Sequence, residues 1–308
     1  MRLQYSIFFF FSAVLILTTG IFLSPVEHAR SAKEVVIEAV DEPAGILRRL
    51  SGDSLLGGPP KMPDQIRRTQ PAGIRIETVA EDLTVPWGMV FTADGSSLYV
   101  SERSGNILRI DMRSPEHSVH KLFESEAVLH RGEGGLMDLA ADPKFKPGTQ
   151  NNNSIYFCET YGRREDARNR VRKLTLADSN TVKKAETLLD NLPAGAYHNG
   201  CRLVFGPEGY LYVTTGDAGN RKLAQDTTSF AGKLLRMKKD GTPAAENPFH
   251  GQKAAPYVYA YGLRNSQGLA WHPENNTLYA TDHGPSGEFG VGGNDEINLI
   301  VKGGNYGW

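Results

Sequence analysis

Ser97-Leu98-Tyr99-Val100 is the first of four short segments that share a tyrosine among aliphatic and small residues. The other three are Ser154-Ile155-Tyr156-Phe157, Tyr210-Leu211-Tyr212-Val213 and Thr277-Leu278-Tyr279-Ala280. Aromatic and β-branched residues in such short runs are typical of β-strands. The tyrosines are separated by 57, 56 and 67 residues. A pattern that returns at this interval indicates an internal repeat.

Each of these segments follows a second apolar segment that begins with glycine, at residues 88–91, 135–139, 200–205 and 268–271. Turn residues such as Asp94-Gly95 and Pro207-Glu208-Gly209 join the two segments, which predicts antiparallel hairpins. A third apolar segment follows in three units, at 106–110, 170–174 and 233–237. Repeated units of this size predict an all-β fold of the β-propeller type, with one unit to each blade. A β-sandwich is the alternative, but it does not explain the regular tyrosine spacing.

The composition excludes two broad classes of protein. The chain has 308 residues and a formal net charge of −1, with 34 Lys and Arg against 35 Asp and Glu. Nucleic-acid binding needs a surplus of positive charge on one face, so no nucleic-acid partner is expected. With 40% hydrophobic residues, the chain has enough apolar material to form a core and is not disordered as a whole.

The sequence predicts three regions. In residues 1–32, Arg2 precedes an apolar run from Ile7 to Leu23, which indicates a cleaved signal peptide or an uncleaved membrane anchor. Residues 33–75 contain Gly57-Gly58-Pro59-Pro60 and are expected to form a largely unstructured linker. Residues 76–308 hold four repeat units and end without a closing strand, so we expect an incomplete propeller from a longer reading frame. The protein is expected to be exported, and so to be periplasmic or extracellular.

Three chemically distinctive residues lie just before the first, glycine-led segment of consecutive repeat units. Glu133, His198 and Arg264 are 65 and 66 residues apart. A neutral imidazole accepts a proton near neutral pH, and a guanidinium group binds carboxylates. Each residue alone also has an ordinary interpretation, such as a loop histidine or an ion pair between blades. Their shared position predicts that all three face one axial cavity.

Calcium and the cysteines are the other chemical questions. Asp282-His283-Gly284-Pro285 and Asn294-Asp295-Glu296-Ile297-Asn298 offer carboxylates and carbonyls, the oxygen ligands that Ca²⁺ prefers, although no EF-hand loop is present. Cys158 and Cys201 are too few for a disulfide scaffold or a zinc site. Export would permit a disulfide between them, but two buried free thiols are the favoured interpretation.

Several long motifs together resemble one family. They are His198-Asn199-Gly200-Cys201-Arg202-Leu203, Gly206-Pro207-Glu208-Gly209, Gly216-Asp217, Arg264-Asn265-Ser266-Gln267-Gly268, Asp295-Glu296-Ile297-Asn298-Leu299-Ile300 and Gly303-Gly304-Asn305-Tyr306-Gly307-Trp308. They are similar to the soluble pyrroloquinoline-quinone (PQQ)-dependent sugar dehydrogenases, and more so to the aldose sugar dehydrogenase branch, over residues 79–308. The resemblance implies a six-bladed propeller of the quinoprotein glucose dehydrogenase type, of which this chain carries about four blades.

The resemblance also implies an activity and its main residues. The family oxidises the anomeric hydroxyl of an aldose to the lactone, transfers the hydride to PQQ and passes electrons to an external acceptor. His198 matches the general base, and Arg264 and Asn265 match cofactor-binding residues. Glu133 lies where the family usually has a cofactor-contacting glutamine. A carboxylate beside an acidic cofactor is repulsive unless it is protonated or bound to a cation.

The same resemblance implies calcium. Gly284 and Pro285 match positions whose carbonyl oxygens hold the cofactor's calcium ion. Glu296 and Tyr306 match a further calcium site, the tyrosine through its backbone oxygen.

Two rival functions are also consistent with these residues. The first is a non-catalytic extracytoplasmic propeller that binds a ligand or a protein, because a fold does not fix a function. The second is a calcium-dependent propeller lactonase, whose site needs several carboxylates and asparagines on the metal. Glu133, His198 and Arg264 suit an acidic organic cofactor better than such a metal.

Overall fold

The computed structural model describes residues 77–146, 153–249, 254–287 and 292–308. The predicted export segment (1–32) and linker (33–75) lie outside these residues. The chain divides into two units, Met1–Asp82 and Leu83–Trp308. The described part of the first unit, residues 77–82, contains no strand. Among all described residues, no helix has the length and apolar character that a membrane span needs.

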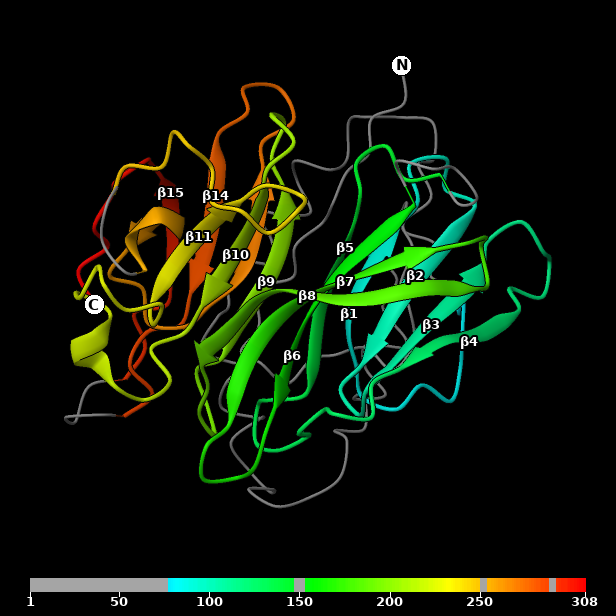
Figure 1. Cartoon of the computed structure of the whole chain (residues 1–308), viewed down its shortest axis with the longest axis horizontal. Coiled ribbons are helices and arrows are strands. Elements are labelled where there is room, and N and C mark those ends of the chain that lie inside the picture. Colours follow the sequence, from blue (N-terminus) through cyan, green and yellow to red (C-terminus); the bar gives the residue numbers. More distant parts are fainter. Residues whose placement is uncertain (1–76, 147–152, 250–253, 288–291) are drawn as a thin grey trace, which may run out of the picture. The chain divides into compact units, whose positions relative to one another are not determined.

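The second unit is built from four antiparallel sheets, the blades of a propeller (Figure 1). Blade 1 has the strands β1 (Pro86–Phe91), β2 (Ser97–Glu102), β3 (Asn106–Asp111) and β4 (Val119–Glu124), and blade 2 has β5 (Leu136–Ala141), β6 (Ser154–Tyr161), β7 (Arg168–Leu176) and β8 (Val182–Pro193). Blade 3 has β9 (Gly200–Phe205), β10 (Leu211–Thr215), β11 (Lys233–Met237) and β12 (Val258–Tyr261), and blade 4 has β13 (Ser266–Trp271), β14 (Leu278–Asp282) and β15 (Glu296–Ile300). Two short 3₁₀ turns, η1 (Arg221–Leu223) and η2 (Ala255–Tyr257), complete the regular elements of the described chain.

The tyrosine repeat has the structural meaning that the sequence predicts. Tyr99, Tyr156, Tyr212 and Tyr279 lie at the same position of the second strand of each blade, opposite Val90, Ala140, Val204 and Ala270 of the first. The first three tyrosines are at most 1% exposed. The apolar alternation therefore fills the spaces between blades, and the all-β propeller expectation is confirmed.

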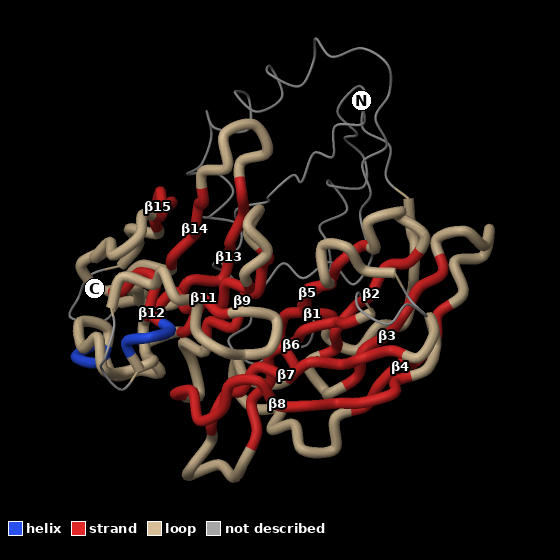
Figure 2. The backbone as a smooth tube through the Cα atoms, turned by 45° about the horizontal axis from the view of Figure 1, so that its top comes forward, coloured by secondary structure: helices blue, strands red, loops and turns tan. Residues whose placement is uncertain are grey.

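The first strands of consecutive blades lie side by side, β1 beside β5, β5 beside β9 and β9 beside β13, as Figure 2 shows. Each first strand has an irregular register near its start, between Pro86 and Met89 in β1 and between Leu136 and Leu139 in β5, and at the corresponding places in β9 and β13. A bulge re-aims the residues beside it. The four inner strands therefore present their first residues in the same way at one edge of the blades, which we call the site edge.

The two cysteines correct the favoured interpretation of free thiols. Cys158 of β6 and Cys201 of β9 form a disulfide, with an S–S distance of 2.03 Å. Both are fully buried in an apolar cluster between blades 2 and 3. Their separation of 43 residues did not show this pairing, because only the stacking of one blade on the next brings β6 and β9 together.

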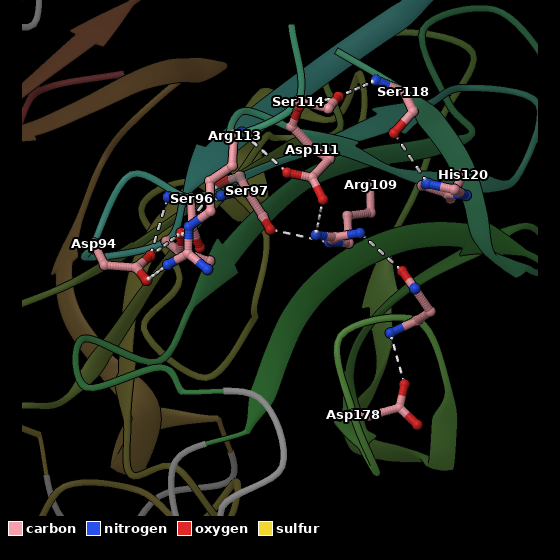
Figure 3. A network of polar contacts seen from close by, with 12 residues as sticks. Asp94, Ser96, Ser97, Arg109, Asp111, Arg113, Ser114, Ser118, His120 and Asp178 are labelled. Carbon is pink, nitrogen blue, oxygen red and sulfur yellow. Dashed lines mark hydrogen bonds and ion pairs between the residues drawn. The ribbon is translucent and has the colours of Figure 1, made fainter. Parts of the chain in front are cut away.

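A polar network joins blades 1 and 2 at the edge opposite the site edge (Figure 3). Arg109 of β3 donates to Ser97 and Asp111 in its own blade and to Asn180 in the β7–β8 turn of blade 2. Its side chain is only 9% exposed, so each guanidinium bond is made largely away from water. The blades are thus held together by polar contacts as well as by apolar packing.

Candidate functional site

The candidate site centres on His198, which lies two residues before β9 at the site edge. His198 has a φ of +61°, an uncommon conformation for a residue with a side chain. The backbone here packs so closely that position 216 must be glycine, because a Cβ on Gly216 would lie 1.9 Å from the His198 carbonyl oxygen. Cys201 and Ala218 nearby also have positive φ values. Unusual backbone of this kind concentrates at functional sites.

The His198 ring is oriented by a buried carboxylate. Its Nδ1 lies 2.7 Å from Oδ1 of Asp217, which follows β10. Asp217 is 2% exposed and His198 is 8% exposed. An ionised carboxylate only accepts hydrogen bonds, so the proton of a neutral imidazole lies on Nδ1. Nε2 then carries the free lone pair, and among the described residues no group hydrogen bonds to it. Nε2 is therefore the ring nitrogen of His198 that is left to accept a proton.

Two further donors keep Asp217 ionised. Nε1 of Trp308 donates to Oδ2 at 2.7 Å, and the backbone N–H of Gly219 donates to Oδ1 at 2.7 Å. Burial by itself would raise the pKa of Asp217, but the hydrogen bonds from His198, Trp308 and Gly219 outweigh it and hold the pKa below the usual value. The carboxylate is thus a fixed acceptor for three N–H groups.

Glu133 reaches the same histidine from blade 2. Its Oε2 accepts the backbone N–H of His198 at 2.8 Å, and its own backbone N–H donates to the Ala196 carbonyl at 2.9 Å. The strand registers refine the spacing argument. Leu136, Gly200 and Ser266 are equivalent, so the residue that corresponds to His198 and Arg264 is Gly134, one place after Glu133. Glu133 joins the site through the fold of its loop rather than through strict equivalence.

Arg264 and Asn265 occupy the corresponding loop of blade 4. Their backbone N–H groups donate to the two oxygens of Asp282, the last residue of β14, at 2.9 and 2.7 Å. Burial is the main reason that the pKa of Asp282 is raised. The Asn265 side chain accepts the backbone N–H of Gly200 at 3.0 Å and so links blade 4 to the His198 strand.

Arg264 and Arg221 form a positively charged group around Trp308, which we call the cationic wall. The guanidinium of Arg264 lies 5.4 Å from the centre of the Trp308 ring, and that of Arg221 lies 4.4 Å from the same centre. Because Trp308 also holds Asp217, the Arg264 side chain and the His198 ring belong to one connected site. Two guanidinium groups and an indole ring suit an acidic aromatic ligand. This donor set fits a PQQ-type cofactor, with Glu133 as an opposing charge on the blade 2 side.

The predicted calcium ligands take part in hydrogen bonds within the protein, and their arrangement does not by itself define a metal site. The Gly284 N–H donates to Asp295 at 2.8 Å, and the Pro285 carbonyl accepts the N–H of Gly293 at 2.9 Å while keeping a second lone pair. Glu296 begins β15 opposite Asp282 and accepts the Asn298 amide. The Tyr306 hydroxyl is bound to the backbone of Leu299 and Val301.

In the described ranges no three His, Cys, Asp or Glu side chains gather as metal ligands. A site built from main-chain carbonyls would not form such a group. The structure therefore brings Glu133, His198, Arg264 and Asn265 together, while both calcium assignments stay predictions.

Asp217 and Trp308 belong to motifs quoted from the sequence, and Asp282 was considered only as a calcium ligand, so their contacts in the site were not predicted. The tyrosine repeat could have indicated Asp282 and Asp217, because of their positions after the blade tyrosines. Asp282 and Thr215 lie three residues after a blade tyrosine, as do the buried Glu102 and Glu159. Asp217 follows two residues beyond that position in blade 3, beside His198. The role of Trp308 has no such signal, because it depends on a segment returning to blade 3.

Comparison with known proteins gives a consistent result. Residues 83–308 match the family model described as glucose/sorbosone dehydrogenase. The chain is 30% identical to quinoprotein glucose dehydrogenase B of Acinetobacter calcoaceticus over 81% of its own length, and 31% identical to an aldose sugar dehydrogenase of Escherichia coli K12 over 77%. It spans 55% and 62% of the lengths of these two relatives.

A solved structure supports the same likeness. The PQQ-bound aldose sugar dehydrogenase of Streptomyces coelicolor superposes with a TM-score of 0.64 and 35% identity. The superposition covers 75% of this chain and 64% of that protein.

Proposed function

Since the chain belongs to the glucose/sorbosone dehydrogenase family, we propose that it is an exported, PQQ-dependent aldose sugar dehydrogenase that oxidises the anomeric hydroxyl of sugars to the lactone. The observation that carries this proposal is the arrangement around His198. Its Nε2 is directed by Asp217 to act as a base, and the cationic wall of Arg264 and Arg221 stands next to it. The quinoprotein relatives support the cofactor.

In this proposal His198 takes the proton of the anomeric hydroxyl at Nε2. The imidazolium that forms is stabilised by the ionised Asp217, which accepts the Nδ1–H bond throughout. General-base help of this kind is typically worth about 10²- to 10⁴-fold in rate. Glu133 holds the backbone of His198, so that the imidazole does not need to reorganise when the proton moves.

Arg264 and Asn265 would bind the carboxylates and polar edge of PQQ. When bound, PQQ supplies the quinone carbon that accepts the hydride from the sugar. We propose that the carbonyl oxygens of Gly284 and Pro285 hold Ca²⁺ beside the cofactor, and that Glu296 and the Tyr306 backbone form a further calcium site. The electrons then pass to an external acceptor. Export, through a cleaved signal or an anchor in residues 1–32, places the proposed reaction in the periplasm or outside the cell.

The test is sugar-dependent reduction of a dye by the full-length protein, reconstituted with PQQ and Ca²⁺. The proposal expects turnover that requires both PQQ and sugar. Replacing Arg264 by Ala should raise the PQQ concentration needed for half-maximal activity by about 10-fold or more, because a charge-assisted contact to a carboxylate is lost. Arg113→Ala, in an exposed ion pair of blade 1, is the matched control.

Other results would favour the rival functions. Hydrolysis of lactones that needs Ca²⁺ but not PQQ would favour the lactonase. Binding of sugar or protein without turnover at saturating PQQ would favour the non-catalytic propeller.

A further inference from the structure

A second feature of the site edge is a pocket of about 100 Å³ beside the His198 loop. Its wall carries three arginines: Arg131 and Arg164 from two different loops, and Arg168, the first residue of β7. One carboxylate, Glu165, lies on the same wall. The lining therefore has an excess of two positive charges in a chain whose net charge is −1. Such an excess favours an anionic occupant.

These arginines differ from most others in the blades. Ion pairs with carboxylates engage six arginines elsewhere, namely Arg109, Arg113, Arg170, Arg172, Arg202 and Arg236. Across the four described ranges, no Asp or Glu forms an ion pair with Arg131, Arg164 or Arg168. The one side-chain bond of this trio runs from Arg168 Nη1 to the Ala167 carbonyl at 2.8 Å. Their guanidinium groups are thus available to a ligand.

The pocket adjoins the catalytic loop on the blade 2 side. Ala194, Gly195 and Ala196 line it, and Ala196 precedes His198 by two residues, so their Cα atoms are at most about 7 Å apart. Arg131 precedes Glu133 by two residues, and Glu133 holds the His198 backbone. Arg264 and Asn265 approach His198 from blade 4 instead. The pocket therefore borders the His198 loop on the blade 2 side, away from the proposed cofactor residues Arg264 and Asn265.

We propose that this pocket is an anion subsite that binds the carboxylate of an acidic aldose, such as a uronic acid, while its anomeric carbon is oxidised at His198. The proposal rests on the proposed function. An arginine fork matches a carboxylate with two parallel hydrogen bonds. Glu165 weakens the subsite by like-charge repulsion. The reaction remains the same, since the carboxylate binds unchanged and only the anomeric C–H and O–H bonds are broken.

The experiment compares glucuronate with glucose as substrates of the reconstituted full-length enzyme. The two sugars differ only in a carboxylate in place of a hydroxymethyl group. Arg164→Gln and Arg168→Gln should each raise KM for glucuronate by about 3- to 5-fold and leave KM for glucose within 2-fold, as loss of one charge contact from an exposed arginine predicts. Glu165→Gln should lower KM for glucuronate. Arg163→Gln is the matched control, because Arg163 precedes Arg164 but does not line the pocket.

A readout without turnover keeps the two proposals separate. Inorganic phosphate should compete with glucuronate more strongly than with glucose, and added salt should weaken this competition. Calorimetric titration with glucuronate, in the absence of dye, should rank the variants by dissociation constant in the same order as KM does. Oxidation of glucose with equal effects of the arginine variants on both sugars would overturn the subsite but not the dehydrogenase. Variants that change only KM for an anionic acceptor would also overturn it, since the pocket would then serve the acceptor.

Discussion

At the scale of single residues, Asp217 determines what His198 can do. It accepts Nδ1–H of His198 and N–H of Gly219 on Oδ1, and Nε1–H of Trp308 on Oδ2. All three partners are donors, so the carboxylate must be ionised to satisfy them. A neutral residue of the same shape cannot accept on both sides.

Replacing Asp217 by Asn tests this arrangement. The amide oxygen would face the two donors on the Oδ1 side, and the amide nitrogen would then oppose the Trp308 N–H. We expect kcat to fall by about 100-fold or more, because the imidazolium loses its counter-charge. Trp308→Phe removes the donor to Oδ2 while keeping an aromatic ring beside Arg264 and Arg221, and it should cost less. The measurement is steady-state dye reduction at saturating PQQ, and an Asp217→Asn enzyme with wild-type kcat would contradict the assignment.

Lys233, a second buried charged residue, should make the unfolding free energy depend on pH. Its ammonium is fully buried and donates to the carbonyls of Leu223 and Ala224 at 2.8 and 2.9 Å. Burial lowers the pKa of Lys233 to about 8, with Asp226 opposing the shift. Between about pH 8 and the ordinary value near 10.5, the folded state binds fewer protons than the unfolded chain.

The cost of burying this cation is therefore greatest below pH 8 and falls as the pH rises toward 10.5. We expect the unfolding free energy of the wild type to increase, relative to Lys233→Met, between pH 7 and pH 10. Urea unfolding at the two pH values measures the difference. A difference that stays constant would show that Lys233 keeps an ordinary pKa in the fold.

At the scale of strands, the disulfide links the element that carries His198 to the neighbouring blade. Cys158 lies in the middle of β6, and Cys201 is the second residue of β9, three residues after His198. The covalent link therefore restrains the start of β9 at the site edge. Its full burial keeps it out of reach of reductants while the blades stay packed.

Replacing both cysteines by Ala should lower the unfolding free energy by about 2–4 kcal/mol, the usual effect of closing a loop of this kind. Thermal and urea unfolding under non-reducing conditions measure the loss. Dithiothreitol should reduce the buried disulfide only when the chain unfolds. In unfolding experiments with dithiothreitol, the unfolding free energy of the wild type should therefore fall toward that of the double variant, whose own value should not change. Two thiols that alkylate in the denatured, unreduced wild type would contradict the disulfide.

At the scale of the molecule, a chain of polar contacts crosses three blades beneath the site. Arg202 of β9 donates to Asp138 of β5 at 2.9 Å and to the Gln267 carbonyl of β13 at 2.6 Å. Asp138 is 3% exposed and also accepts the Leu203 N–H at 2.8 Å. Burial raises the pKa of Asp138, although Arg202 opposes the shift. This contact joins strands of blades 2, 3 and 4.

Arg202→Met should therefore be strongly destabilising, by about 3 kcal/mol, because it leaves a buried carboxylate without its cation. The loss should be smaller at acid pH and grow as the pH rises through the raised pKa of Asp138, since a protonated carboxyl tolerates burial. Adding Asp138→Asn should recover part of the stability. Chemical unfolding at several pH values measures both effects, with Arg113→Met as an exposed control; equal losses in the two variants would contradict this role.

The sequence by itself determined the repeat, the order of the strands and the family motifs. These follow from local rules: Tyr99, Tyr156 and Tyr212 mark strands that must bury one face, and glycine-containing turns close each hairpin. The sequence also selected His198 and Arg264, because residues before equivalent strands of a propeller meet at one edge. Glu133 was selected by the same argument although it lies one place from the equivalent position, and Asn265 by the family resemblance alone.

Only the tertiary structure decided which groups touch. The pairing of Cys158 with Cys201, the return of Trp308 to Asp217 and the pocket of Arg131, Arg164 and Arg168 each join segments of different blades or distant loops. Such contacts depend on the angle and distance at which one sheet stacks on the next. Those quantities arise from the packing of all side chains between the blades, and no local pattern of residues encodes them.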